Sequence, residues 1–175
     1  RVPQSERVVF HSDAELTPVY LTEILANRQL LQQDLSIFML HAILTSTFIA
    51  IPIAISQMVG FSLKYHGLVY LVALIPAFLL MVPFVVIAEK KRKMKQVYLL
   101  AIFTILLTQG LLLIWHHSYV TISLILFFFF TAFITLEALI PSLVSKIAPA
   151  GRKGTALGIY SSLQFFGMFL GGAVG

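Results

Sequence analysis

The feature that most constrains this chain is a series of five long apolar runs separated by short polar segments. The runs cover residues 35–59, 67–88, 97–115, 120–144 and 154–175. Each has about 19–25 residues, and about 20 apolar residues are needed to cross the hydrocarbon core of a bilayer as a helix. A membrane-spanning strand needs only about 9–11 residues of alternating polarity, so strands do not fit these runs. Because a helix satisfies its own backbone hydrogen bonds in lipid, we expect an all-α, polytopic membrane protein.

Composition supports this class and excludes several others. Hydrophobic residues make up 59% of the 175 residues and charged residues only 11%, whereas a soluble domain has about 45–50% and about 25%. One soluble core could not bury so much apolar surface, which excludes a soluble enzyme, a nucleic-acid binder and a disordered chain. The chain has no cysteine, so disulfides and thiolate metal sites are excluded as well.

The charges between the runs predict an orientation in the membrane. The 89–96 loop contains five Lys or Arg residues and one acid, and the 145–153 loop contains three basic residues. The 116–119 loop between them contains no Lys or Arg. Cytoplasmic loops are enriched in Lys and Arg, so we expect the two basic loops to be cytoplasmic. By parity, residues 1–34 are cytoplasmic too.

Residues 1–34 differ from the rest because they are mostly polar. Within them, residues 21–31 have one apolar face, which is compatible either with an amphipathic helix on the membrane surface or with a solvated loop. The chain begins at Arg1 rather than at Met and stops at Gly175 inside an apolar run. We therefore expect it to be a piece of a longer protein.

Enzyme motifs are missing from the sequence. It contains no G-x-S-x-G, H-E-x-x-H, phosphate-binding or dinucleotide-binding pattern, so we expect no catalytic residue, cofactor or metal ion and no enzyme. The adjacent His116 and His117 lie in a short loop, where a solvated turn is a better interpretation than a metal site.

Two ionisable residues, His41 and Glu137, stand inside the apolar runs. A charged residue near the bilayer centre costs about 2–3 kcal/mol, so such groups usually face a bundle interior or a wet cavity. His41 lies about 10 Å past Asp34 and Glu137 about 13 Å before Lys146, at about 1.5 Å per helical residue. Both are therefore at a similar depth from the cytoplasmic side and are candidates to share one cavity.

These two residues are suited to carrying a proton. A carboxyl group in an apolar medium takes up a proton readily, and histidine titrates near neutral pH. The alternative is structural: a neutral histidine bonded to backbone and a protonated acid.

Three further polar residues are candidates for lining the same cavity. Thr45 lies four residues after His41, and Tyr160 and Gln164 share one helical face. The fifth run also carries glycines four residues apart, at 154 and 158 and at 167, 171 and 175. Such spacing lets two helix backbones approach closely, so we expect packing there.

Several segments resemble a known family. The loop Glu89-Lys-Lys-Arg-Lys-Met-Lys95 resembles the basic loop of the major facilitator superfamily, in its weaker second-half copy between helices 8 and 9. Residues 149–167 look like the entry into helix 11 of that family. Residues 40–48 and 136–143 are similar to its YajR-like branch.

This resemblance implies that the five runs are helices 7 to 11 of a 12-helix bundle and that residues 1–34 link its two six-helix halves. Helices 7 and 10 of the family line the central cavity, and His41 and Glu137 fall on them. The resemblance also marks Glu89, Lys90, Arg92 and Lys93 as the cytoplasmic basic-loop motif. Glu89 stands where the family has Asp, and Arg92 where it has Gly, so the gating ion pair of the loop is expected to be altered or absent.

The expected function is therefore secondary active transport in a bacterial inner membrane. On resemblance, we expect proton-coupled export of a small amphipathic molecule by alternating access. The expected partners are the lipid bilayer, protons, the small-molecule substrate and the N-terminal six-helix half of the same chain, with no nucleic acid. One alternative is a membrane-embedded receptor or assembly subunit of the same fold without transport. An intramembrane enzyme is disfavoured because no nucleophile and base are paired.

Overall fold

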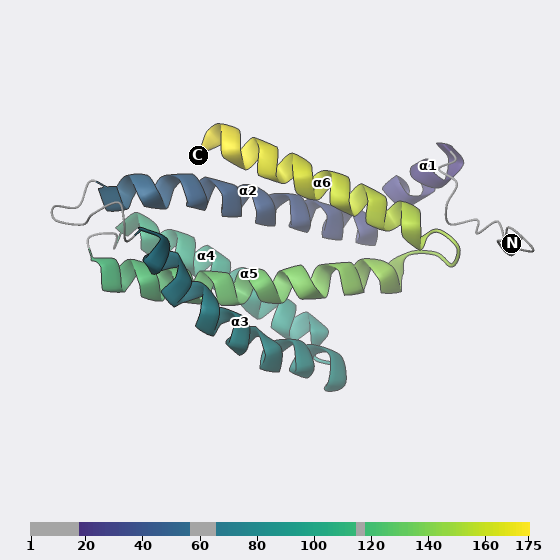
Figure 1. Ribbon diagram of the computed structural model, residues 1–175. Helices are drawn as coiled ribbons and strands as arrows, with labels where there is room; N and C mark the ends of the chain where they lie inside the picture. The colour runs from purple at the N-terminus through teal and green to yellow at the C-terminus, as the bar shows by residue number, and fades with distance from the viewer. Residues whose placement is uncertain (1–17, 57–65, 115–117) are drawn as a thin grey trace, which may run out of the picture.

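Six helices make up the part of the chain that the structure, a computed structural model, describes: residues 18–56, 66–114 and 118–175 (Figure 1). They are α1 Pro18–Ala26, α2 Arg28–Ser56, α3 His66–Lys90, α4 Met94–Ile114, α5 Tyr119–Ile147 and α6 Lys153–Val174. The described residues include no strand, and α2 to α6 are each long and apolar enough to cross a membrane. The all-α fold class and the five predicted spans are confirmed.

The first span begins earlier than its hydropathy indicated. Helix α2 starts at Arg28, so the helix that contains the first run also includes residues 28–34. The Asn27 side chain accepts hydrogen bonds from the backbone N–H groups of Gln29 at 3.0 Å and Leu30 at 3.3 Å, which caps the helix. Hydropathy marks only the stretch that lipid surrounds, whereas a helix continues to its cap.

Residues 21–31, for which the sequence allows a surface helix or a solvated loop, fall on two helices. A helix is present, but it is α1, which ends at Ala26, and the chain then turns at Asn27 into α2. The side chain of Ile24 is 1% exposed, because α1 packs against α2 and α6. Residues 1–17 of the predicted linker, and the predicted run ends 57–59 and 115, lie outside the described residues.

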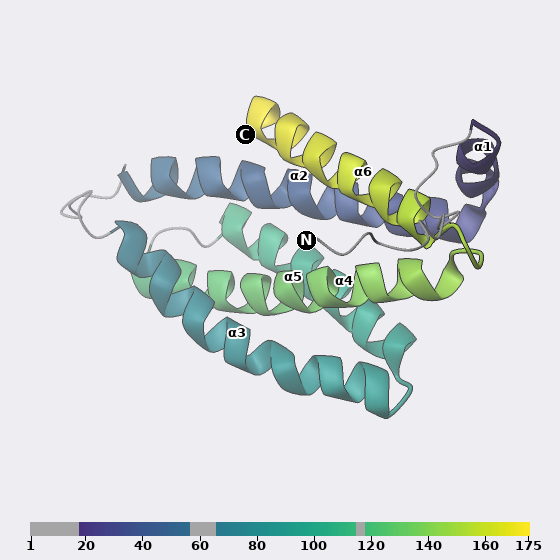
Figure 2. The same ribbon diagram turned by 45° about the vertical axis from the view of Figure 1, so that its right-hand side comes forward.

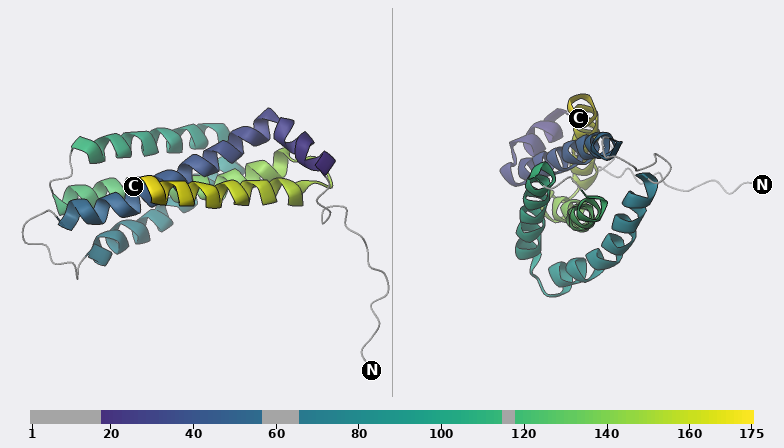
Figure 3. Two further views of the ribbon diagram at one scale, coloured as in Figure 1. Left: turned by 90° about the horizontal axis from the view of Figure 1, so that it is seen from above. Right: turned by 90° about the vertical axis from the view of Figure 1, so that its left-hand side faces the viewer.

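Helix α5 is the centre of the bundle (Figures 2 and 3). Helices α3 and α4 pack against one side of α5. Helices α2 and α6 contact another side of α5 and pack most extensively against each other. The ends of α3 and α5 and the starts of α4 and α6 lie at the same end of the bundle as α1 (Figure 1). The ends of α2 and α4 lie at the opposite end. This alternation is the one that a chain crossing a bilayer five times requires.

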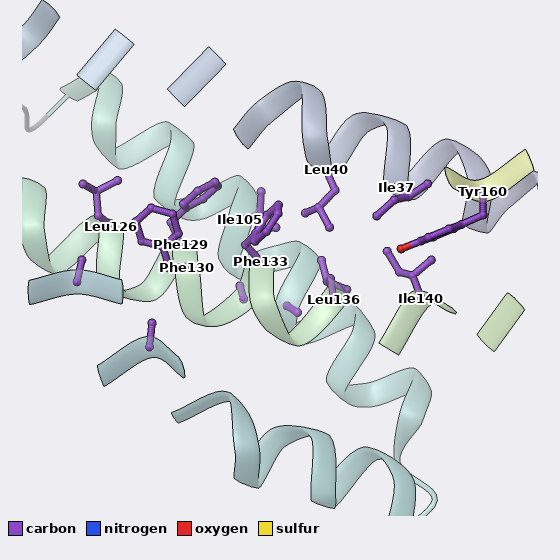
Figure 4. Close-up of a cluster of buried hydrophobic side chains, with 14 of the residues drawn as sticks. Ile37, Leu40, Ile105, Leu126, Phe129, Phe130, Phe133, Leu136, Ile140 and Tyr160 are labelled. Atoms are coloured by element: carbon purple, nitrogen blue, oxygen red, sulfur yellow. The ribbon is translucent and has the colours of Figure 1, made fainter. Parts of the chain in front are cut away.

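Apolar side chains from α5 fill the core. Phe129, Phe130 and Phe133 pack there with Leu40 of α2 and Ile105 of α4 (Figure 4). Helix α5 is buried around most of its circumference, which is the pattern of a helix enclosed by others. Helix α4 instead exposes large apolar side chains along its outer face, which suits a helix in contact with lipid.

Glycines bring α6 close to α2. A side chain at Gly167 would overlap the carbonyl group of Phe38, and one at Gly171 would overlap that of Ala42. The close approach that the second glycine series predicted is therefore present. The first series behaves differently, because Gly158 meets no atom within 4 Å. The expectation of close packing at Gly158 is wrong for the described chain: that face of α6 has no neighbouring helix.

Candidate functional site: a polar triad of three helices

Three polar side chains meet inside the bundle, one from each of three helices. The His41 Nε2 atom on α2 lies 3.5 Å from the Glu137 Oε2 atom on α5. The Gln164 Nε2 atom on α6 lies 2.9 Å from His41 Nε2 and donates to Glu137 Oε1 at 3.1 Å. We call these three residues the polar triad. The structure thus brings together the two deep ionisable residues and one of the predicted cavity-lining residues.

The surroundings of His41 determine its tautomer. Its side chain is 3% exposed, and its Nδ1 atom lies 3.2 Å from the Ile37 carbonyl oxygen, one turn earlier on α2. Since the Gln164 amide donates to Nε2, the ring hydrogen is on Nδ1 and is donated to Ile37. The Phe133 ring lies edge-on at a centroid distance of 5.4 Å. In this arrangement the His41 Nε2 atom is the acceptor that faces Gln164.

The Glu137 carboxyl group has two unequal oxygens. Oε1 accepts from Gln164, whereas Oε2 has no hydrogen-bond partner among the described residues and faces His41. The side chain is 36% exposed, so one side of the group is open. A proton placed on His41 Nε2 would turn that atom from acceptor to donor, and Oε2 is the acceptor within reach. The triad can therefore hold a proton at either of two atoms.

Thr45 and Tyr160 lie beside the triad and do not belong to it. The Thr45 hydroxyl donates to the His41 carbonyl oxygen at 2.7 Å, so it bonds to its own helix. The Tyr160 side chain is buried, and its oxygen points between Ile37 and Ile140 (Figure 4). Of the three predicted lining residues, Gln164 is the one that the structure bonds to the side chains of both His41 and Glu137.

Sequence reasoning missed Asp34. Hydropathy places it at the polar edge of the first run, but it lies inside α2 and is 2% exposed. Its Oδ1 atom is buried and has no hydrogen-bond partner among the described residues. Asp34 and His41 are seven residues apart and share one helical face. That spacing was the available signal, and it was hidden because the helix extends beyond the apolar run.

The basic-loop motif is built around an ion pair that joins two helices. Lys146 Nζ on α5 donates to both carboxylate oxygens of Glu89 at 2.7 and 2.8 Å, and Ser142 Oγ donates to Oε1 at 2.7 Å. The residues Lys90, Arg92 and Lys93 of the same motif are exposed. Arg92 has a φ of 54°, the left-handed region in which glycine is the usual residue. Arg92 therefore forms the tight turn between α3 and α4. Glu89 ties the end of α3 to α5 through Lys146.

A metal centre finds no support in the described ranges, which contain no cluster of three or more His, Cys, Asp or Glu residues placed to hold an ion. His116 and His117 lie outside the described residues.

Comparison with known proteins agrees with this architecture. The sequence profile of the Major Facilitator Superfamily matches residues 2–172. The chain is 39% identical to the inner membrane transport protein YajR of Escherichia coli K12, over 99% of this chain and 38% of that protein. It is 31% identical to an uncharacterized transporter of Buchnera aphidicola, over 98% of this chain and 43% of that protein. No solved structure matches the chain.

The chain thus spans less than half the length of these curated relatives. The profile match, by contrast, covers almost every residue, from the polar segment before α1 to the last turn of α6. This multi-pass chain of membrane-spanning helices therefore belongs to the Major Facilitator Superfamily and is YajR-like.

Proposed function

We propose that the complete protein is a secondary active transporter of a bacterial inner membrane, which exports a small amphipathic molecule in exchange for protons. The observation that carries this proposal is the polar triad: an imidazole and a carboxyl group 3.5 Å apart in apolar spans. Intramembrane ionisable residues are costly and commonly mark ion and substrate pathways. The names of the relatives, which are transport proteins, favour the same function.

The triad supplies a way to couple a proton to helix movement. With His41 neutral, the Gln164 amide bridges its Nε2 atom to Glu137 and so ties α6 to α2 and α5. A proton on Nε2 repels the amide donor and attracts Glu137 Oε2 instead. Protonation therefore replaces a contact among α2, α5 and α6 by a contact between α2 and α5 alone. A conformational equilibrium shifts when one state gains contacts that the other lacks.

The surroundings of Glu137 suit an amphipathic substrate. Its partly exposed carboxyl group stands one turn from Phe133 and among apolar side chains of α5. A polar or cationic end of the substrate binds the ionised carboxylate, and an apolar body packs against the apolar surface of the spans beside it. A proton arriving at Glu137 then competes with the substrate, which gives exchange by alternating access. In this orientation residues 1–34 and the 89–96 and 145–153 loops are cytoplasmic.

The experiment uses the full-length protein in vesicles with an imposed pH gradient and an amphipathic fluorescent cation as the probe. We expect Glu137→Gln to fold and to lower gradient-driven accumulation at least about 10-fold, because the amide cannot release a proton. His41→Ala should shift the pH optimum or weaken the coupling. The double variant should lose no more than Glu137→Gln alone if both groups handle one proton.

The matched control is Thr135→Val, a substitution of similar size on the opposite face of α5, where the hydroxyl only donates to the Thr131 carbonyl oxygen. It should transport like the unmodified protein. Accumulation by Glu137→Gln at the unmodified level would make Glu137 structural. If the unmodified protein moves neither probe nor protons, the receptor or assembly-subunit alternative holds.

A further inference from the structure

A groove opens between α3 and α4, with α5 as its floor. It has a volume of about 210 Å³ and is walled by Leu80 and Phe84 of α3 and by Leu100 and Thr104 of α4. The α5 residues of the floor include Phe128 and Ala132. This groove lies on the other side of α5 from the polar triad, and the proposed transport mechanism makes no use of it.

The groove offers only apolar surface to an occupant, although three threonines line it. The Thr104 hydroxyl donates to the Leu100 carbonyl oxygen at 2.9 Å. Thr131 donates to the Phe127 carbonyl oxygen and Thr135 to that of Thr131, at 2.8 and 2.7 Å. Each hydroxyl hydrogen is thus used within its own helix. The groove therefore suits a hydrocarbon chain and not a polar ligand.

One end of the groove meets a concentrated positive charge. The groove-lining residue Val97 donates its backbone N–H to the Lys93 carbonyl oxygen at 3.0 Å, so Lys93 lies one turn beyond the groove on that face. Lys91 directly follows α3, and its backbone N–H donates to the Ile87 carbonyl oxygen at 3.2 Å, so it lies at the end of the other wall. Lys91 and Lys93 are both exposed, and we call them the basic pair.

Among the described residues, no acid forms an ion pair with Lys91 or Lys93. Residues 89–96 contain one acid, Glu89, and it is already paired with Lys146 of α5. A basic cluster at the end of membrane-spanning helices attracts anionic lipid headgroups.

The outer surfaces on both sides of the groove are apolar. Leu79 on α3 and Phe103 and Leu106 on α4 are large apolar residues that are more than 60% exposed. From the apolar groove, the exposed apolar residues around it and the basic pair at its end, we propose that the α3–α4 groove binds an anionic phospholipid. One acyl chain lies in the groove, and the phosphate binds the basic pair. This inference is independent of the proposed transport.

The headgroup is tested on the full-length protein in detergent, by native mass spectrometry with phosphatidylglycerol or with phosphatidylcholine of the same acyl chains. We expect phosphatidylglycerol to be retained in preference. Lys91→Gln with Lys93→Gln should weaken its binding about 25-fold, at about 5-fold for each basic residue. The matched control, Lys95→Gln with Lys153→Gln, removes the same charge, from the opposite face of α4 and from α6, and should bind normally.

The acyl-chain position is tested by filling the groove. Thr104→Trp and, separately, Leu100→Trp should abolish retention of phosphatidylglycerol, whereas Leu99→Trp on the far face of α4 should not. Leu100 and Leu99 are 51% and 53% exposed, so both positions accept a large side chain. Equal retention of the two lipids, equal losses in both lysine pairs, or normal retention by the groove-filling variants would each overturn the proposal.

Discussion

At the residue scale, the decisive contact is made by Gln164. The sequence made it one of three candidates to line the cavity, and in the structure its amide nitrogen lies between His41 Nε2 and Glu137 Oε1. Two acceptors from different helices therefore depend on one donor. We therefore expect this amide to contribute more to the free energy of unfolding than an ordinary interhelical hydrogen bond, which contributes about 0.6 kcal/mol in membrane proteins.

This predicts unequal effects for two glutamine substitutions. Gln164→Leu leaves both acceptors of the triad without their donor and should destabilise the full-length protein by about 1–2 kcal/mol. The control, Gln109→Leu, removes an amide that donates to Thr47 Oγ1 at 3.3 Å, and its effect should be smaller. Thermal melting in detergent measures both. Equal melting temperatures for the two variants would show that the triad contributes no such stability.

At the scale of elements, α2 and α6 are held together by backbone proximity. Gly167 and Gly171 lie against the backbone of Phe38 and Ala42, and Ser46 Oγ donates to the Gly171 carbonyl oxygen at 3.0 Å. Because α2 carries His41 and α6 carries Gln164, this contact positions two members of the triad. Helix packing in lipid depends on such close approach, since apolar area alone gives little advantage there.

Two glycine substitutions on α6 should therefore differ. Gly171→Leu forces α6 away from α2 and should cost about 1–3 kcal/mol or more, the usual penalty of overpacking. Gly158→Leu points into open space and should be neutral or slightly stabilising, since leucine is the better helix former. Folded yield and melting temperature in detergent distinguish them. Comparable losses at both positions would mean that Gly158 also contacts a helix in the complete protein.

At the scale of the whole molecule, five helices alternate between the two ends of the bundle (Figure 1). The α3–α4 connection with Arg92 lies at the end that carries α1, and Ser118 lies at the other end before α5. A charged connection on one side and an uncharged one on the other is the arrangement that positive-inside orientation requires.

Labelling tests this orientation directly, because the chain contains no cysteine of its own. Single cysteines at positions 92 and 118 of the full-length protein should react with a membrane-impermeant reagent from opposite sides. Position 92 is expected to be cytoplasmic. Labelling of both from one side would contradict the number of spans.

The sequence by itself determined the class and the number of spans, since both depend on apolar length, and it predicted a similar depth for His41 and Glu137 from their positions along their own helices. It did not determine the start of α2, because the helix begins at the Asn27 cap and not where the apolar run begins. For that reason, hydropathy alone placed Asp34 outside the helix. The contact of His41, Glu137 and Gln164 joins residues 27 to 123 positions apart. Periodicity describes one helix at a time, and only the packing of α2, α5 and α6 decided which faces meet. The same packing decided that Gly171 is a contact and Gly158 is not, although both belong to the same spacing pattern.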